Sequence, residues 1–400
     1  MTARNVSCSP KVSLGIDVLV GQGGRLLEGR NVGLLVHPAS TDSRLRPTVD
    51  VLSSMNTVRV CALFGPEHGF GGEFQDQESV ATRLYRPLGI PMYSLYGESK
   101  DSLVPSRDML EGIDTFVVDL QDIGIRYYTF IYTMSYCMEA CREYGVDVVV
   151  LDRPNPLGGL EIEGNIVGEG FRSFVGRYPL PVRHGMTIGE LALMFNDAFG
   201  IGCSLTVVPM KGWQRWMWHD DTGLAWVMPS PNMATLETAT VYGGACLVEA
   251  TNVSEGRGTT HPFELIGAPW VCSEELARTM NDRGLPGVVF RPHNFQPCFH
   301  KWSGQLCGGV QIHVRERTQF KPFLTGICLL EVLYRGWPDQ FEWRLEPYEF
   351  EVERLAVDLL AGGGWLREAL EKGTPIQECQ ERWGPELNEF KRVRRNYLLY

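Results

Sequence analysis

The sequence predicts an α/β fold in which a Rossmann-like, doubly wound N-terminal domain (residues 1–265) precedes a smaller α+β C-terminal domain (residues 266–400), with an active cleft between them. Three observations support this prediction. Near-continuous runs of Val, Ile and Leu are typical of parallel strands buried on both faces. These runs alternate with helical segments in the order strand, loop, helix. After Ile266 the runs become shorter, and helix-like and strand-like segments mix.

The first half of the chain repeats this order several times. An apolar segment over residues 11–20 leads to GQGG, which lacks the spacing of a nucleotide-binding loop and is interpreted as a turn. Strands are expected within NVGLLVHPAS, VRVCALF, IPMYSLYG, GIDTFVVDLQDIG and VDVVVLDRPNPLGG. One helix is expected near residues 46–54. A second, YTFIYTMSYCMEACREYG, should end at Gly145, a C-terminal cap.

The middle of the chain is less regular. HGMTIGELALMFNDAFG has helical periodicity, with Thr187 as N-cap and Glu190 completing a capping box. CSLTVVPMKGW and GLAWVMPSPN are interpreted as strands that run into loops, and YGGACLVEATNVSEGRGTTHPFE as a further strand ending near Glu249. Three tryptophans between the first two segments form either a sugar-stacking platform or a buried connection. They are Trp213, Trp216 and Trp218.

The smaller domain is predicted from two helices, CSEELARTMNDRG and PFLTGICLLEVLYRG, and two strands, GVVFRP and GGVQIHV. The tail from Phe350 onward mixes short amphipathic helices and closes in FKRVRRNYLLY. Its basic run is interpreted as a solvated helix face or as a partner for the acidic body of the protein.

Composition excludes several classes of protein. The formal net charge of -11 argues against a nucleic-acid binder, which needs a basic face. The 11 cysteines are scattered without a C-x-x-C pair, which favours buried reduced thiols in a reducing compartment. No signal-like segment and no long apolar run is seen, so we expect a cytoplasmic protein without membrane contact. No cofactor is expected, since a phosphate loop is missing and the histidines are too dispersed for a metal site.

Polar side chains gather at the ends of the expected strands. Glu67 and His68 follow VRVCALF on a Gly-rich loop, and ligands of open α/β sheets bind beyond such strand ends. A core does not need so many hydrogen-bonding groups, so they predict a polar cleft for a polyhydroxylated ligand. The alternative is that Glu67 caps a turn and His68 is a semi-buried structural residue. The full set is Glu67, His68, Asp119, Gln121, Asp122, Arg126, Asp152, Arg153, Asn155, Ser230, Asn232, Glu249, Asn252, Glu255 and Arg257.

Five motifs resemble those of a known family. GPEHGF, DLQDIGIRYYTFIYTM, LDRPNPLGG with EGN after it, MPSPNM and EATNVSEGRGTTHPFELIGAPW occur in the order found in the NamZ-type exo-β-N-acetylmuramidases. The resemblance runs through essentially the whole chain. It implies a glycosidase that releases terminal N-acetylmuramic acid from the non-reducing end of peptidoglycan fragments, for cell-wall turnover and recycling. The family's catalytic glutamate in GPEHG corresponds to Glu67.

Glycoside cleavage needs an acid that protonates the leaving oxygen and usually a second carboxylate. We assign Glu67 as the acid, with His68 either positioning it or sharing its proton. The second carboxylate is sought among four residues, between which the sequence does not choose: Asp119, Asp122, Glu249 and Glu255. Alternatively, the acetamido group of the substrate is the nucleophile, and a carboxylate or Tyr128 orients it.

Muramic acid carries a lactyl carboxylate, which an arginine fork would read. Arg126, Arg153 and Arg257 are the candidates, although each can instead be a structural ion-pair partner. Arg257 is favoured because glycines surround it and their N–H groups can join it in binding an anion. Gln121, Tyr128, Asn155, Asn232 and Asn252 are further binding candidates. The rival hypotheses are a non-catalytic muropeptide-binding or other carbohydrate-binding protein and a nucleotide-dependent enzyme.

Overall fold

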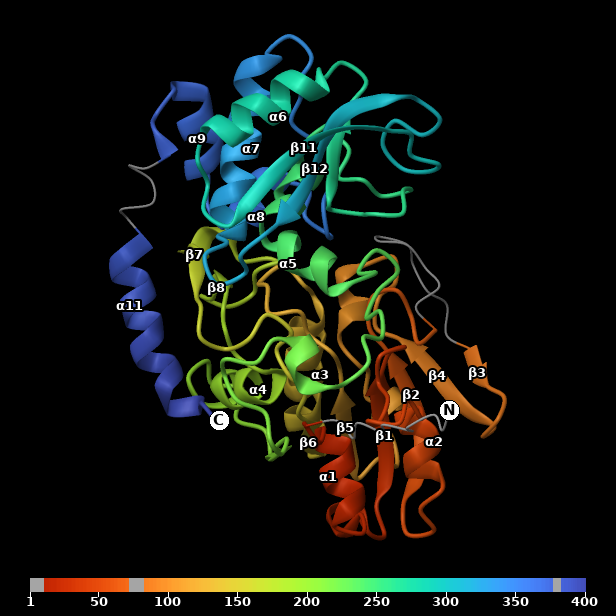
Figure 1. The fold of residues 1–400 in the computed structure, drawn as a ribbon. Helices are drawn as coiled ribbons and strands as arrows, with labels where there is room; N and C mark the ends of the chain where they lie inside the picture. The colour runs from red at the N-terminus through yellow and green to blue at the C-terminus, as the bar shows by residue number, and fades with distance from the viewer. Residues whose placement is uncertain (1–10, 72–82, 377–382) are drawn as a thin grey trace, which may run out of the picture.

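The computed structural model describes residues 11–71, 83–376 and 383–400. Figure 1 shows a larger lobe, built by the first half of the chain, and a smaller lobe above it, built mainly by the second half. The predicted class of fold, a Rossmann-like α/β unit with a smaller α+β unit, is confirmed. The predicted boundary at residues 265 and 266 falls at the first strand of the smaller sheet and stays a prediction.

The larger lobe is organised around a seven-stranded sheet of order β3-β4-β2-β1-β5-β6-β9. Its strands pair in parallel except β3 and β4, which are antiparallel. The order reverses on either side of β1, so the sheet has the crevice at which doubly wound folds bind ligands. The strands are β1 (Asn31–Val36), β2 (Arg59–Gly65), β3 (Arg83–Tyr85), β4 (Ile90–Ser94), β5 (Thr115–Asp119), β6 (Asp147–Leu151) and β9 (Leu205–Val208).

Helices cover both faces of this sheet. One apolar cluster joins α1 (Gly15–Gly21) and α2 (Thr48–Ser53) to one face, and another joins α3 (Phe130–Tyr144) and α4 (Ile188–Asp197) to the other. The predicted caps are confirmed: Thr187 and Glu190 form a capping box at the start of α4, and Gly145 ends α3 with a φ of 72°.

Two predicted strands are wrong. Residues 236–250, expected in part to be a strand, form α5 (Leu236–Ala245) and a 3-10 turn. Almost all of this segment is buried, and a short buried run does not distinguish strand from helix. Gly244 lies so close to α7 (Pro322–Gly336) that a Cβ atom there would lie 2.8 Å from the amide nitrogen of Gly326. GLAWVMPSPN contains no strand; its two prolines lack the N–H groups that a ladder requires.

The smaller lobe has an antiparallel sheet of order β10-β12-β11, with α6 and α7 packed beside it. A hairpin of β7 and β8 from the larger lobe contacts α7. The strands are β7 (Glu163–Ile166), β8 (Pro181–Arg183), β10 (Leu265–Ala268), β11 (Val288–Phe295) and β12 (Cys307–Val314). The helices are α6 (Ser273–Asp282), α8 (Ala356–Ala361), α9 (Trp365–Lys372) and α11 (Trp383–Arg394).

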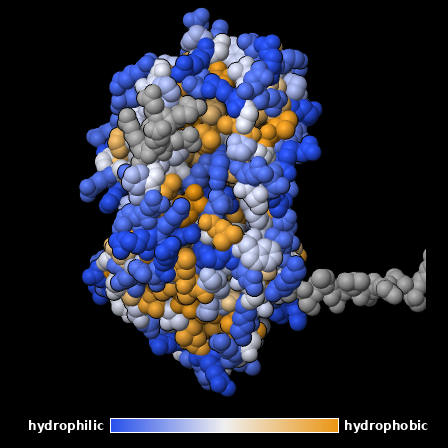
Figure 2. Space-filling view, turned by 60° about the vertical axis from the view of Figure 1, so that its left-hand side comes forward, coloured by the Kyte–Doolittle hydropathy of each residue, from blue (hydrophilic) through white to orange (hydrophobic). Residues whose placement is uncertain are grey.

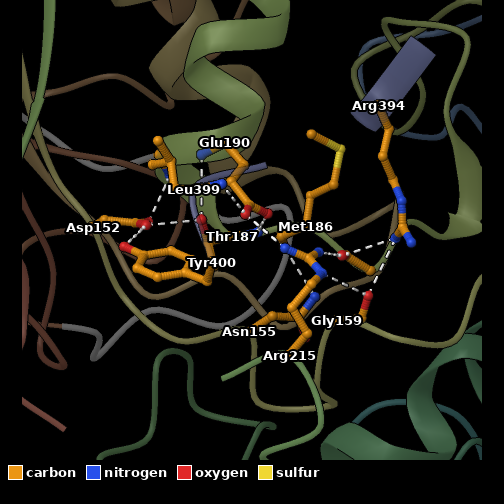
Figure 3. Close-up of polar contacts among 12 residues, drawn as sticks. Asp152, Asn155, Gly159, Met186, Thr187, Glu190, Arg215, Arg394, Leu399 and Tyr400 are labelled. Carbon is orange, nitrogen blue, oxygen red and sulfur yellow. Dashed lines mark hydrogen bonds and ion pairs between the residues drawn. The ribbon is translucent and has the colours of Figure 1, made fainter. Parts of the chain in front are cut away.

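The end of the chain returns to the larger lobe. Figure 1 shows α11 running beside both lobes and the C-terminus lying near α4. The Tyr400 hydroxyl donates to Asp152, and the Leu399 N–H donates to Glu190 (Figure 3). The arginines of the basic run near the C-terminus make two kinds of contact. Arg392 pairs with exposed Glu389, whereas Arg394 is half-buried and donates to backbone carbonyls.

The described surface is mixed in polarity, and the described cysteines are unpaired with one another. Figure 2 shows one face that is mostly hydrophilic, with apolar residues gathered in patches. Among the described residues, no helix combines the length and apolarity needed to cross a membrane. The nine cysteines in the described part of the chain are free thiols, and six of them are buried. They are Cys137, Cys141, Cys203, Cys246, Cys307 and Cys328.

Candidate active site

A cavity lies at the carboxyl edge of the large sheet, where the two lobes meet. It encloses about 500 Å³, including space open to solvent. The loop after β2, the start of α3, the 230–233 loop, α5 and the segments that follow it contribute its walls. Its lining residues include Glu67, His68, Tyr128, Thr129, Ser230, Asn232, Tyr242, Glu249, Arg257, Phe263, Tyr348 and Glu349.

Glu67 is delivered to this cavity by a tight loop. Gly65 ends β2, and a Cβ atom at that position would lie 2.8 Å from the backbone nitrogen of Phe70, so the loop needs glycine to fold back. The Glu67 side chain is buried, and its Oε2 accepts a 2.8 Å hydrogen bond from the Thr129 hydroxyl. Thr129 stands at the N-cap position of α3, so the positive end of that helix dipole lies near the carboxylate. His68 follows with a left-handed φ of 71°.

Glu249 and Arg257 form a buried ion pair in the opposite wall. The Arg257 guanidinium donates to Glu249 Oε1 over 2.6 Å, and the Tyr348 hydroxyl donates to Glu249 Oε2 over 2.7 Å. The guanidinium also lies over the Phe263 ring, 5.0 Å from its centroid. Both oxygens of Glu249 are therefore committed to partners, and its carboxylate holds Arg257 at the cavity.

Glu255 lies behind this pair. Its fully buried carboxylate has ion pairs with Arg257, His300 and Lys301, at 3.1, 3.3 and 2.9 Å. Burial alone would raise the pKa of Glu255, but these cations outweigh burial and hold the pKa below its ordinary value. The Lys301 ammonium also donates to the carbonyls of Val248 and Val253. Glu255 thus supports the wall from behind.

Tyr128 presents a buried hydroxyl to the cavity. The hydroxyl lies beside Ser230 but has no hydrogen bond of good geometry within the described part of the chain. Burial raises the pKa of Tyr128 well above its ordinary value, so the hydroxyl stays protonated and can donate. A buried polar group without a partner costs free energy unless a ligand or water satisfies it. The Tyr128 hydroxyl is therefore a polar group at the cavity that a ligand or water could satisfy.

His37 holds the 230–233 loop in place. Burial, reinforced by the charge of Arg153, lowers the pKa of His37 to about 3, so its ring is neutral. The ring accepts the Gln121 N–H at Nε2 over 2.8 Å, which leaves Nδ1 to donate to the Pro229 carbonyl. Sequence reasoning treated His37 only as the end of a strand, because its partners are distant in the chain.

Several predicted site residues are held in structural contacts outside the cavity. Arg153 forms a buried ion pair with Asp119, as the structural alternative anticipated. Asp122 accepts from the Gly124 N–H and lies 3.3 Å from His184. The fully buried Arg126 donates to the backbone carbonyls of three segments. Asn155 donates to the Met186 carbonyl and accepts from the Leu157 N–H. Asp152 accepts the Gly189 N–H at the start of α4.

Other candidates line separate hollows. Gln121 and Arg153 border a hollow that also contains His219. Asn252 borders a wider hollow with His300 and Lys301, on the far side of the Glu249 wall.

The three tryptophans do not line the cavity. Trp213 is buried and packs edge-on against Tyr400, with ring centroids 5.2 Å apart. Trp218 lies between two guanidinium groups, each 5.3 Å from its ring centroid. Trp216 is half exposed. These positions favour the interpretation of a packed connection over a sugar platform at this cavity.

The chain matches the models of both parts of one known protein family. The family model for the N-terminal part of the exo-β-N-acetylmuramidase NamZ matches residues 32–237, and the model for its C-terminal part matches residues 240–400. Over 391 residues the chain is 45% identical to the peptidoglycan β-N-acetylmuramidase NamZ of Bacillus subtilis (strain 168), covering 98% of this chain and 92% of that protein.

Two crystal structures of DUF1343 family proteins from Bacteroides fragilis NCTC 9343 have the same fold. The first has a TM-score of 0.88 at 35% identity and covers 98% of this chain and 99% of its own. The second has a TM-score of 0.76 at 28% identity, covering 97% and 99%.

Proposed function

Because the chain belongs to the NamZ family of exo-β-N-acetylmuramidases, we propose that it hydrolyses its substrate in the cavity around Glu67. The chain is a glycosidase that acts on peptidoglycan. We further propose that it removes N-acetylmuramic acid from the non-reducing end of short fragments. This location is supported because Glu67 lies in one cavity with the buried Arg257 and with the Tyr128 hydroxyl, which has no well-formed hydrogen bond among the described residues.

Glu67 is proposed as the general acid. The Thr129 hydroxyl donates to its Oε2 and so holds the carboxyl group in place beside the cavity. The rings of Tyr128, Tyr242 and Phe263 line the cavity and help to exclude water from it. His68 lies next to Glu67 in the same cavity and is proposed to help position it.

Arg257 is proposed to bind the lactyl carboxylate that distinguishes muramic acid from glucosamine. It lines the cavity and is buried, which strengthens a charge-assisted hydrogen bond. Tyr128 and Asn232 are proposed to bind hydroxyl or acetamido groups of the same sugar, since both line the cavity. Arg257 is favoured for this role because it lines the cavity, whereas Arg126 and Arg153 are held in structural contacts outside it.

The proposed setting is the cytoplasm, in the recycling of imported muropeptide sugars. The described cysteines are free thiols, which favours a reducing compartment. The proposed partner is therefore a small muramyl sugar rather than an intact cell wall.

A defined disaccharide tests this function. Wild-type protein should release free N-acetylmuramic acid from N-acetylmuramyl-β-1,4-N-acetylglucosamine, and Glu67→Gln should lower kcat by about 10²–10⁴-fold. The loss should be smaller on a 4-nitrophenyl β-muramide, whose leaving group needs no proton. Exposed Glu28 provides the control variant, Glu28→Gln, which should keep full activity.

The rival is a protein that binds the sugar without cutting it. Binding of the disaccharide by calorimetry, with no released product at any enzyme concentration, would favour that rival. Equal losses of Glu67→Gln on both substrates would contradict the assignment of Glu67 as the acid.

A further inference from the structure

Glu349 stands out among the residues that line the catalytic cavity. It reaches the same cavity as Glu67 from the opposite lobe, and its side chain is only 8% exposed. Its backbone has a φ of 49°, and the next residue, Phe350, has a φ of 64°. Two consecutive residues other than glycine rarely adopt left-handed conformations, and such strain collects where a side chain must be aimed. The segment is therefore built to aim Glu349 into the cavity.

Packing on both sides holds this strained segment. Phe350 packs edge-on against Tyr96, with centroids 5.1 Å apart, and lies 6.0 Å from the Phe174 ring. The Tyr96 hydroxyl donates to Glu349 Oε2 over 2.9 Å. On the other side, the Tyr348 hydroxyl donates to Glu249. A carboxylate fixed in this way keeps its geometry when substrate enters.

The other acidic candidates are committed elsewhere. Both oxygens of Glu249 are bound by Arg257 and Tyr348. Glu255 lies behind the wall in ion pairs with Arg257 and Lys301, and Asp119 is paired with Arg153. A carboxylate held in an ion pair is a weak proton acceptor, because the neighbouring cation stabilises its charged form. None of these groups is therefore suited to take up a proton at the reacting carbon.

We propose that Glu349 is the second catalytic carboxylate, an inference that rests on the function proposed above. A water molecule attacks the anomeric carbon and its proton passes to Glu349, while Glu67 gives its proton to the leaving oxygen as the glycosidic bond breaks. One water is consumed, and each product sugar carries a hydroxyl. Glu349 then returns a proton to solvent and Glu67 takes one up, which resets the pair. Tyr96 is a positioning residue that fixes the Glu349 carboxylate.

Kinetics on two substrates test this role. Glu349→Gln should lower kcat by at least about 10²-fold on both the disaccharide and the 4-nitrophenyl β-muramide, because both need an activated water. KM should change less than about threefold, since the removed proton transfer acts in the transition state. Exposed Glu353 lies four residues away, and Glu353→Gln should retain wild-type kinetics.

Azide separates a base from a binding residue. In Glu349→Ala, azide should restore turnover of the nitrophenyl substrate and give the α-glycosyl azide, because an anion needs no base to attack. Three results would each overturn the proposal. The first is a folded Glu349→Gln variant that keeps more than a tenth of wild-type kcat, and the second is a variant in which only KM changes. The third is a covalent sugar trapped on Glu349.

Should the Glu349 variants fail to fold, Tyr96→Phe tests the same geometry without removing the carboxylate. It should lower kcat about 3–10-fold and shift the acidic limb of the pH profile upward, because it deletes a hydrogen bond to the charged form. An unchanged pH profile would overturn the proposal. Inactive wild-type protein would instead refute the proposed function, so the two failures are distinguishable.

Discussion

At the scale of single residues, the charge around Arg257 decides what the cavity can bind. Arg257 is shared by two carboxylates, Glu249 and Glu255, which would leave it unable to attract an anion. The Lys301 ammonium contacts Glu255 from behind and compensates its negative charge. In a poorly solvated wall, these charges act strongly on one another. We infer that the supporting cation keeps Arg257 available for a substrate carboxylate.

Tyr128 gives a prediction that separates binding from folding. In Tyr128→Phe, a hydroxyl with no well-formed hydrogen bond among the described residues is removed, so the free energy of unfolding should change by less than about 1 kcal/mol. KM for the disaccharide should rise about 5–100-fold, because a hydrogen bond to the ligand worth about 1–3 kcal/mol is lost. Steady-state kinetics and urea unfolding measure the two effects. A large loss of stability with an unchanged KM would contradict the ligand role.

The sequence predicted some site residues and missed others for a physical reason. Glu67 and His68 follow a strand directly, and strand ends meet at one edge, so they could be found from local pattern. Tyr348 and Glu349 lie in an irregular segment far along the chain, with no periodicity that would link them to β2. Asp119 and Arg153 were predicted by the same strand-end argument, but they pair with each other, which a linear pattern does not reveal.

At the scale of elements, the caps and strands could be predicted because they depend on neighbours in sequence. The helix α5 could not, because its conformation is set by a close crossing with α7, where Gly244 meets Gly326. The same crossing brings the start of α7 against the β7–β8 hairpin. The buried side chain of Glu163 in β7 accepts the Leu324 N–H over 2.9 Å and so satisfies a backbone donor in the first turn of α7.

This carboxylate predicts a pH dependence of stability. Burial raises the pKa of Glu163 from 4.5 to about 7, so the folded state holds its proton more tightly than the unfolded state. Its contribution to stability is full below pH 4.5 and is lost as the pH rises through 7. Glu163→Gln cannot titrate, so wild type should lose up to about 3 kcal/mol relative to this variant between pH 4.5 and 8.

Urea unfolding at several pH values measures this difference. Glu161 offers the matched control, since its half-exposed carboxylate is paired with Lys321 over 2.7 Å and is charged throughout this range. Glu161→Gln should differ from wild type by a nearly constant amount. A constant difference for Glu163→Gln as well would show that Glu163 is ionised when buried.

At the scale of the whole molecule, the last helix connects the lobes. Trp383 begins α11 against Phe323 and Trp365 of the smaller lobe, with ring centroids 5.3 and 5.4 Å apart. The helix ends at the larger lobe, where Figure 3 shows Arg394 and Arg215 converging on the same backbone carbonyls. Beyond it, Tyr400 and Leu399 contact Asp152 and Glu190, next to β6 and α4. Since the cavity has walls from both lobes, this helix helps to set its width.

Removing one attachment should loosen the lobes without touching the cavity. In Arg394→Met, the carbonyls of Gly159 and Gly185 lose a charged donor, and the free energy of unfolding should fall by about 2–4 kcal/mol. Arg392→Met, on the same helix, removes only an exposed ion pair with Glu389 and should cost less than about 1 kcal/mol. Calorimetric unfolding measures both variants. Because Arg394 attaches α11 to the larger lobe, Arg394→Met should also broaden the unfolding transition or split it in two. Equal effects of the two substitutions would show that α11 does not connect the lobes.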